Sequence, residues 1–254
     1  MTVRYEVKDH VAVVTIDRPE VLNAMNLDVF DGLYECGRRA AADPEARAVL
    51  VTGEGRAFSS GIDTTIFTTG PEGPIDIARL QRAFTLYAEI PLPTIAAVRG
   101  PCLGGGLQLA IACDLRVVAD DARLSAFEIN WGIIPDLGGT QRLPRLIGMG
   151  RAQEMVLTGR SVGGPEALGW GLANRCVSPE DVLDDAFSWA SELAAGPPLA
   201  LAAAKRLTAT ALDLPVHSGL RREATAQRKM LASEDFIEAV TAKMQKRPPE
   251  YRGR

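Results

Sequence analysis

The chain has 254 residues, of which 46% are hydrophobic and 24% are charged, and its formal net charge is −4. This length suits one large domain, or one domain with a small appendage, and the composition is that of an ordinary globular protein. The acidic balance argues against nucleic-acid binding, so an anionic ligand must be bound by local groups. We find no apolar run of ~18 residues and no signal-peptide pattern, and therefore expect a cytoplasmic protein without a membrane span.

Cysteine and histidine are sparse and scattered. The four cysteines show no CxxC pairing, which argues against a zinc site and a disulfide framework. The two histidines, His10 and His217, lie near no candidate nucleophile in a recognisable motif, which argues against a Ser-His-Asp hydrolase. We therefore expect neither a metal nor a redox cofactor. The cysteines are Cys36, Cys102, Cys113 and Cys176.

The first half of the chain alternates strands with helices. Residues 3–17 alternate and are rich in β-branched side chains, which predicts a hairpin, and Asn26 is placed to cap the helix that follows. Short apolar runs at 46–52, 94–98 and 115–119 are typical of buried strands. Helical spacing fills the segments between them. The pattern predicts an α/β fold with a mostly parallel sheet and crossover helices.

Helices dominate after about residue 140. The breaks between them fall at Gly159, Gly171 and residues 196–198, and Ser233 is placed to cap the last helix. We therefore expect an α/β core followed by a helical C-terminal region, with no flexible linker.

Two glycine-bearing segments follow buried strands, at residues 57–63 and 100–108. A backbone without Cβ can approach a ligand closely, and a helix that begins near Gly105 adds unpaired N–H groups with a partial positive charge. Two such donors aimed at one carbonyl oxygen form an oxyanion hole. Tight packing is the commoner explanation for such turns. A phosphate loop does not fit, because the lysine of GxxxxGK[ST] and the GxGxxG fingerprint are both missing.

The motifs, in their order and spacing, resemble the crotonase (enoyl-CoA hydratase/isomerase) superfamily. The resemblance spans nearly the whole chain. It is carried by residues 18–24, the two glycine segments, and residues 112–116, 132–135, 138–143, 171–173, 233–238 and 246–248. It implies a ClpP-like α/β fold of repeated ββα units over residues 1–195. It also implies a helical oligomerisation region over residues 196–254, which forms homotrimers or hexamers.

The resemblance also assigns roles by position. The oxyanion donors would be the N–H groups of Ile62 and Gly105. The substrate would be an acyl-coenzyme A thioester, so coenzyme A enters as part of the substrate and no separate cofactor is needed. Its binding stretch would be Ile62, Asp63, Thr64 and Thr65. Leu22 and Ala24 would lie near the adenine.

The chain departs from the hydratase pattern at one catalytic position. Hydratases of the family use two glutamates to add water. One matches Glu128, whereas the other is replaced by Gln108. A carboxylate accepts a proton from water, but a neutral amide only forms hydrogen bonds with it. We therefore favour double-bond isomerisation over hydration. A weak hydratase and a non-catalytic acyl-CoA-binding protein remain as alternatives.

A second carboxylate can complete the acid–base set. Asp136 follows Glu128 by eight residues, a spacing that resembles the pair in dienoyl-CoA isomerases. A turn residue after Pro135 is an equal explanation for Asp136, and a surface ion pair is the alternative for Glu128. Trp131 is a candidate for the acyl pocket or for the core. We expect the mobile-looking residues 67–76 to shape acyl-chain selection. Residues 243–247 carry cations that could bind coenzyme A phosphates from a neighbouring subunit or form a solvated helix end.

Overall fold

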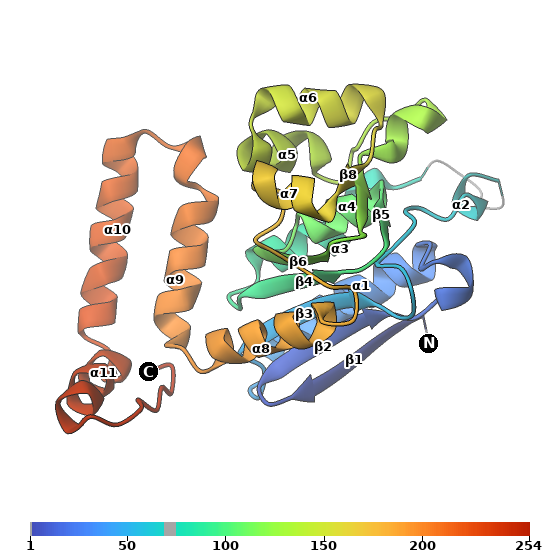
Figure 1. Cartoon of the computed structure of the whole chain (residues 1–254). Coiled ribbons are helices and arrows are strands. Elements are labelled where there is room, and N and C mark those ends of the chain that lie inside the picture. Colours follow the sequence, from blue (N-terminus) through green and yellow to red (C-terminus); the bar gives the residue numbers. More distant parts are fainter. Residues whose placement is uncertain (1, 69–74) are drawn as a thin grey trace.

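A computed structural model describes residues 2–68 and 75–254 (Figure 1). Six strands form the main sheet, in the spatial order β1-β2-β3-β4-β6-β9. The β1–β2 pair is antiparallel and the four other pairs are parallel. These strands are β1 (Val3–Lys8), β2 (Val11–Ile16), β3 (Ala48–Gly53), β4 (Thr94–Val98), β6 (Leu115–Ala119) and β9 (Arg175–Val177). The predicted hairpin and the mostly parallel sheet are therefore confirmed.

A second, smaller sheet lies next to the first. Its order is β5-β7-β8, with β5 and β7 parallel and β8 antiparallel to β7. Its strands are β5 (Pro101–Leu103), β7 (Arg123–Ser125) and β8 (Val162–Gly163). We did not predict these strands, because runs of two or three residues carry no hydrophobic period. They matter for function, because β5 leads directly into the glycine run 104–106.

Helices connect and cover the sheets, as the alternation of apolar runs predicted. The helices of the core are α1 (Leu27–Ala42), α2 (Thr65–Thr68), α3 (Ile77–Glu89), α4 (Gly105–Ala110), α5 (Gly139–Ile147), α6 (Met149–Thr158), α7 (Gly164–Trp170) and α8 (Val182–Ala194). Asn26 caps α1, as predicted, by accepting a hydrogen bond from Val29 N at 3.1 Å. Short 3-10 helices cover Pro19–Val21, Phe127–Trp131 and Ala211–Asp213.

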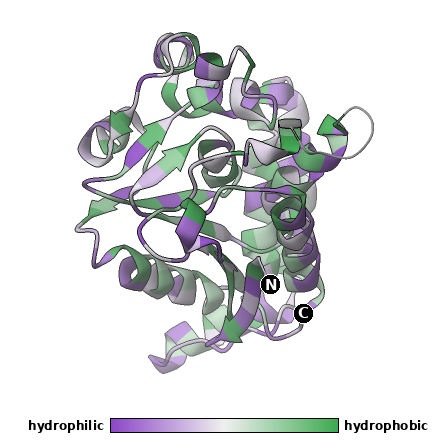
Figure 2. Cartoon of the chain, turned by 90° about the vertical axis from the view of Figure 1, so that its right-hand side faces the viewer, coloured by the Kyte–Doolittle hydropathy of each residue, from purple (hydrophilic) through white to green (hydrophobic). Residues whose placement is uncertain are grey.

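The central strands are buried on both faces. Every residue of β4 is buried, and successive side chains of a strand point to opposite faces, so both sides of the sheet are covered. Helix α8 packs across β2, β3, β4 and β6, whereas α1 packs on β1, β2 and α3. Small side chains on α8 allow its close approach to the sheet. They recur every four residues at Ala186, Ala190 and Ala194. Figure 2 shows that the helices carry both hydrophobic and hydrophilic residues, as expected of helices with one face toward the core.

The C-terminal helices stand to one side of the core (Figure 1). They are α9 (Pro198–Ala209), α10 (Val216–Leu231) and α11 (Glu234–Gln245). Ser233 caps α11 as predicted, by accepting a hydrogen bond from Phe236 N. Lys205 ties α9 to the core through the carbonyl oxygens of Tyr87 and Leu92, each at 2.8 Å. No residue of α9 is fully buried. The division at residue 195 into a core and an oligomerisation region stays a prediction.

Candidate active site

The two glycine-bearing loops lie side by side. The backbone of Ser59 pairs with the strand β5: its N–H donates to Pro101 O and its carbonyl accepts from Leu103 N, both at 3.0 Å. This parallel bridge places residues 57–63 next to the turn that begins α4. Residues far apart in the sequence therefore form one wall of a common site.

The N–H groups of Ile62 and Gly105 are neighbours. The carbonyl of Gly61 accepts from Met25 N at 2.8 Å, and Asp63 N donates to Met25 O at 3.0 Å. Because the peptide between Gly61 and Ile62 is trans, the Ile62 N–H points away from Met25. Gly105 opens α4, where the first N–H groups have no acceptor inside the helix. A Cβ on Gly105 would lie 3.8 Å from Ile62 N, and neither N–H donates to any other described residue.

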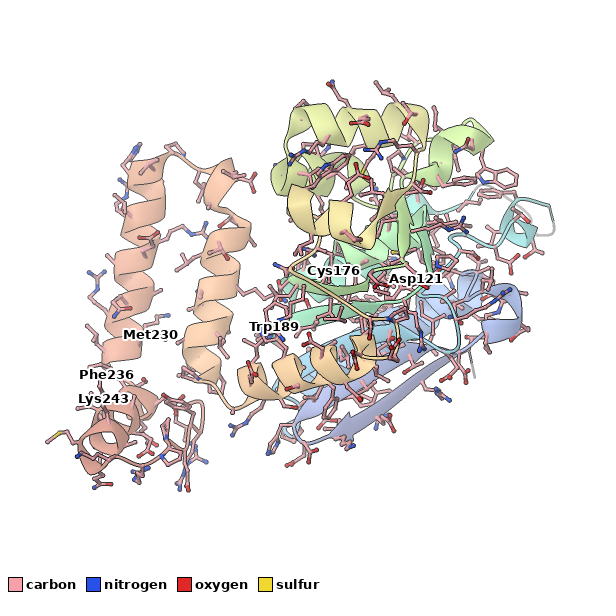
Figure 3. All side chains as sticks on the ribbon, in the orientation of Figure 1. Asp121, Cys176, Trp189, Met230, Phe236 and Lys243 are labelled. Atoms are coloured by element: carbon pink, nitrogen blue, oxygen red, sulfur yellow. The ribbon has the colours of Figure 1, made fainter. Side chains whose placement is uncertain are left out.

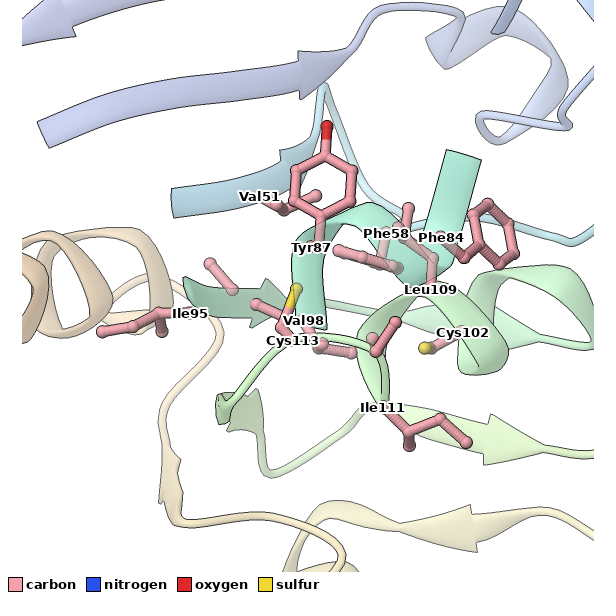
Figure 4. Close-up of a cluster of buried hydrophobic side chains, with 14 of the residues drawn as sticks. Val51, Phe58, Phe84, Tyr87, Ile95, Val98, Cys102, Leu109, Ile111 and Cys113 are labelled. Carbon is pink, nitrogen blue, oxygen red and sulfur yellow. The ribbon is translucent and has the colours of Figure 1, made fainter. Parts of the chain in front are cut away.

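Close approach makes glycine necessary around these donors. Gly104 has a φ of +51°, which L side chains rarely adopt. A Cβ on Gly106 would meet Ser59 O at 2.7 Å, a distance that real contacts do not reach. Behind this turn, α4 is anchored by the buried side chain of Leu109, which Figure 4 shows among Phe58 and Phe84 of the core. The helix N-terminus is thus held rigidly against the loop.

Glu128 is the carboxylate that lies beside these donors. It belongs to the 3-10 helix Phe127–Trp131 and is only 5% exposed. Its Oε1 accepts from Gln108 Nε2 at 2.7 Å, whereas its Oε2 is buried and has no partner among the described residues. Burial raises the pKa of Glu128 above its ordinary value, the charge of Asp136 adds to this rise, and the hydrogen bond from Gln108 opposes it. An unpartnered buried carboxylate oxygen is suited to exchange a proton with a ligand.

Gln108 is fixed by three hydrogen bonds. Its Oε1 accepts from Leu137 N at 2.7 Å and from Gly139 N at 2.9 Å, and its Nε2 faces Glu128. Two backbone donors on one side leave only one orientation for the amide. The side chain is 1% exposed, so its role is to hold Glu128 and the start of α5.

Asp136 lies close enough to Glu128 for its charge to affect the Glu128 pKa. Its side chain is half-buried, and burial raises its pKa above the ordinary value. The Asp136 carbonyl accepts from Gln81 Nε2 of α3 at 2.6 Å, which fixes this turn on the core. Asp136 also lines a cavity, and its catalytic role stays a prediction.

Two cavities adjoin at this point. The glutamate cavity is lined by residues of the two glycine-bearing loops and of the 3-10 helix that carries Glu128. Its lining residues are Ser60, Gly61, Ile62, Thr64, Phe67, Gly104, Gly105, Phe127, Glu128, Trp131 and Ile133. The aspartate cavity has a volume of about 370 Å³. It is lined by Asp136 and by Ile62, Ile66, Phe67, Ile75, Ile77, Leu80, Gly132, Ile133 and Ile134. Three side chains, those of Ile62, Phe67 and Ile133, belong to both. An apolar chamber with one carboxylate therefore adjoins a smaller cavity that contains the backbone donors.

The segment at Leu22 and Ala24 is tied to the 57–63 loop by an ion pair. Arg18 Nη1 lies 2.9 Å from Asp63 Oδ2 and also donates to Ala24 O at 2.5 Å. Asp63 Oδ1 accepts from the Thr65 hydroxyl at 2.7 Å. The Thr65 hydrogen bonds and the Arg18 guanidinium lower the pKa of Asp63, which stays ionised. Asp63 thus acts within the protein, holding two segments together.

The structure brings most of the predicted site together. Ile62, Gly105, Glu128 and Thr64 line the glutamate cavity. Trp131 also lines it and is 64% exposed, so the core-packing alternative for this residue is wrong. The surface alternative for Glu128 is wrong as well. Five predicted ligand residues are not among the described residues that line the two cavities, and their contact with the acyl-CoA substrate stays a prediction: Leu22, Ala24, Asp63, Thr65 and Gln108.

Several lining residues were missed from the sequence. Phe127 precedes Glu128, and Ile133 follows Gly132. The motifs identified Glu128 and Gly132, so closeness to a motif was the only indication of these lining residues in the sequence. Of the stretch 67–76, which we expected to shape acyl-chain selection, Phe67 and Ile75 line the aspartate cavity. Residues 69–74 lie outside the described part of the chain.

The C-terminal cations lie far from this site. Figure 3 labels Lys243 and Phe236 on α11, well away from the sheet. Arg247 is paired with Glu238 of the same segment, so it is not a free phosphate ligand within one subunit. In the described ranges, no helix is long and apolar enough to cross a membrane. The same ranges hold no group of three or more metal-ligating side chains.

Comparison with known proteins agrees with the geometry. The model of the enoyl-CoA hydratase/isomerase family matches residues 6–254. A probable enoyl-CoA hydratase of Rhodobacter capsulatus is 38% identical over 100% of this chain and 98% of its own length. A carnitinyl-CoA dehydratase of Escherichia coli K12 is 38% identical over 95% and 94%. The crystal structure of an enoyl-CoA hydratase from Bacillus anthracis superimposes with a TM-score of 0.94 at 31% identity, covering 100% of both chains. The chain belongs to the enoyl-CoA hydratase/isomerase family, within the crotonase superfamily of enzymes.

Proposed function

We propose that this enzyme isomerises a double bond of an enoyl-coenzyme A thioester through an enolate. The thioester carbonyl oxygen accepts hydrogen bonds from Ile62 N–H and Gly105 N–H. Both donors belong to rigid backbone, so they need no reorganisation when negative charge develops on that oxygen. Removing one such donor typically costs ~10²–10³ in rate.

Glu128 is the base in this proposal and Asp136 is the acid. Burial raises the pKa of both carboxyls, and the charge of Asp136 adds to the rise at Glu128. The hydrogen bond from Gln108 favours the ionised form at Glu128. Glu128 Oε2 removes a proton from C2 of the substrate, and the electron pair moves into the enolate. The enolate then takes the proton of Asp136 at the far end of the conjugated system.

Atoms balance over this cycle. One C–H bond breaks at C2 and one forms at C4, or at C6 for a dienoyl substrate, while the double bond moves toward the thioester. Glu128 ends protonated and Asp136 ionised. Exchange of protons with solvent restores the starting state, and no water molecule is consumed.

The observation that carries this proposal is the way the Gln108 side chain is hydrogen-bonded. Its oxygen is occupied by Leu137 N and Gly139 N, and one of its N–H groups is occupied by Glu128. A hydratase needs a second carboxylate at this position to activate water, and an amide cannot accept a proton. The remaining carboxylate, Asp136, faces an apolar chamber.

The chamber indicates the substrate class. Aliphatic side chains dominate its lining, so we propose an aliphatic acyl group, held there by burial of apolar surface. The test is to supply 3-enoyl-, 3,5-dienoyl- and 2-enoyl-CoA and to follow the ultraviolet absorbance. Conversion of 2-enoyl-CoA alone, to a 3-hydroxy product, would contradict the isomerase assignment.

Hydration is the second candidate. The relatives named probable enoyl-CoA hydratase and carnitinyl-CoA dehydratase favour it, because both names describe addition or loss of water. With one general acid–base group missing, we expect a weak hydratase, roughly 10²–10⁴-fold below a two-glutamate enzyme. Tight coenzyme A binding without turnover of any enoyl-CoA would instead favour a binding protein.

We also propose a homotrimer or hexamer. Large apolar side chains of the C-terminal region are exposed in the single chain, and a second copy would cover them. They include Leu212, Val216, Leu220, Phe236, Ile237, Val240 and Met244. Light scattering on the purified protein tests this state, and a monomer at micromolar concentration would overturn it.

A further inference from the structure

Ser59 belongs to the 57–63 loop, its backbone pairs with Cys102 of the other glycine-bearing loop, and it is 0% exposed. Its hydroxyl donates to Asn23 O at 2.8 Å and accepts from Gly61 N at 3.1 Å. A single buried hydroxyl therefore joins the 18–24 segment to the residue that precedes one of the two donors.

The hydroxyl acts on the most adjustable residue of the loop. Gly61 has a φ of +105°, in a region that other residues rarely adopt, so nothing intrinsic to the chain fixes it there. Its N–H is held by Ser59 and its carbonyl by Met25 N, which lies two residues after Asn23. The direction of the Ile62 N–H depends on both of these anchors, because it shares a peptide plane with the Gly61 carbonyl.

Ser59 also sets the spacing between the 57–63 loop and the second donor, the Gly105 N–H. The backbone of Ser59 is paired with β5, and a Cβ on Gly106 would meet Ser59 Cβ at 2.9 Å. The loop and the first turn of α4 are thus in contact at Ser59. Loss of the hydroxyl would leave Gly61 N–H and Asn23 O without this partner, and an unpaired buried polar group destabilises the arrangement that needs it.

We propose that Ser59 is a positioning residue for the reaction, which orients the Ile62 N–H toward the thioester oxygen through Gly61. It touches no reacting atom. The inference rests on the oxyanion hole of the proposed function, but not on whether the product is an isomer or a hydrate.

The first test is Ser59→Ala in the enoyl-CoA assay. Since a displaced donor weakens the transition state more than the ground state, we expect kcat to fall roughly 10- to 100-fold while KM changes less than about threefold. Ser59→Cys restores a weak donor and acceptor, and its kcat should lie between those of Ser59→Ala and the parent protein.

Thr94→Val provides the matched control. Thr94 is also fully buried, and its hydroxyl bonds Tyr87 O and Asp114, at the start of β4 and outside the hole. This variant loses a buried hydroxyl and should lower thermal stability while retaining kcat. Equal loss of kcat in both variants would assign Ser59 a purely structural role.

A binding measurement separates this inference from the reaction type. Acetoacetyl-CoA loses its C2 proton to form an enolate that absorbs in the ultraviolet, and a working hole lowers the pH at which the bound ligand ionises. Ser59→Ala should raise that pH by about one unit relative to the parent protein, a tenfold loss of enolate stabilisation. If the parent protein turned over no enoyl-CoA, the proposed function would be contradicted. The ionisation of bound acetoacetyl-CoA would still test the role of Ser59. An unchanged ionisation in Ser59→Ala would overturn the role of Ser59.

Discussion

Gln108 Nε2 donates a hydrogen bond of 2.7 Å to Glu128 Oε1, and both side chains are buried. The bond leaves Oε2 as the free oxygen of the carboxylate. An amide at position 108 therefore orients the proposed base, Glu128, but cannot act as a second base. The predictions for Glu128 and Gln108 follow from this difference between the two oxygens of Glu128.

Glu128→Gln should abolish activity and stabilise the fold. Loss of the carboxylate beside the proposed oxyanion hole removes ~10²–10⁴ in rate, whereas replacing a poorly solvated charge removes its desolvation cost at neutral pH. We expect a melting temperature about 2–4 °C higher. Glu154→Gln is the matched control, because Glu154 is an exposed partner of Arg160 and should affect neither activity nor stability strongly. Full activity in Glu128→Gln would remove Glu128 from the mechanism.

The difference in stability between the parent protein and Glu128→Gln should depend on pH. Burial raises the folded-state pKa of Glu128, so the folded protein binds this proton more tightly than the unfolded chain. The contribution of the group to stability is then complete below its unfolded pKa and is lost as pH rises through the raised folded pKa. Melting curves should therefore show little gain for Glu128→Gln at low pH and a growing gain toward neutrality. A gain that shrinks as pH rises would contradict the direction of the shift.

Gln108→Glu should shift the enzyme toward hydration. The new carboxylate would keep one oxygen on Leu137 N and Gly139 N and place the other against Glu128 Oε1, so the pair must share a proton. Two carboxyls beside the hole can then activate water. We expect 3-hydroxyacyl-CoA formation from 2-enoyl-CoA to rise at least ~10-fold. Gln141→Glu, at an exposed position of α5, is the control, and equal hydration in both variants would refute the role given to Gln108.

Arg18→Gln should weaken substrate binding with little effect on the chemical step. Arg18 joins Asp63 to Ala24 O, so its loss loosens the segment proposed for coenzyme A. A loss of ~1 kcal/mol of substrate-binding free energy corresponds to about a fivefold rise in KM at unchanged kcat. Arg4→Gln removes an exposed ion pair with Glu54 and serves as the comparison. A fall in kcat alone would show that the pair supports the hole instead.

The cysteines should differ in reactivity. Burial raises the pKa of Cys36 to about 11 and that of Cys113 to about 12, and it also raises the pKa of the fully buried Cys102. Thiolates are the reactive form, so these three should resist alkylation in the native protein at pH 8. Cys176 is partly exposed and should be labelled first, as mass spectrometry of peptides can check. Rapid labelling of Cys102 in the native state would contradict this burial.

Local pattern in the sequence predicted much of the architecture. Apolar runs identified β3, β4 and β6, because strands buried on both faces need continuous hydrophobicity. The caps at Asn26 and Ser233 were predicted because capping depends on the chemistry of one short side chain. The motifs also identified Ile62, Gly105 and Glu128, which the structure places at one cavity.

Only the tertiary structure decided how these groups act together. The environment of Glu128 depends on Gln108, twenty residues away, and on Leu137 N and Gly139 N at the start of another helix. The sequence determined which residues carry donors and carboxyls, since each is a property of one residue type and its immediate neighbours. Long-range packing decides which oxygen of Glu128 stays unpartnered. It also brings the Ser59 hydroxyl to Asn23 O and Gly61 N, and no local pattern encodes either contact.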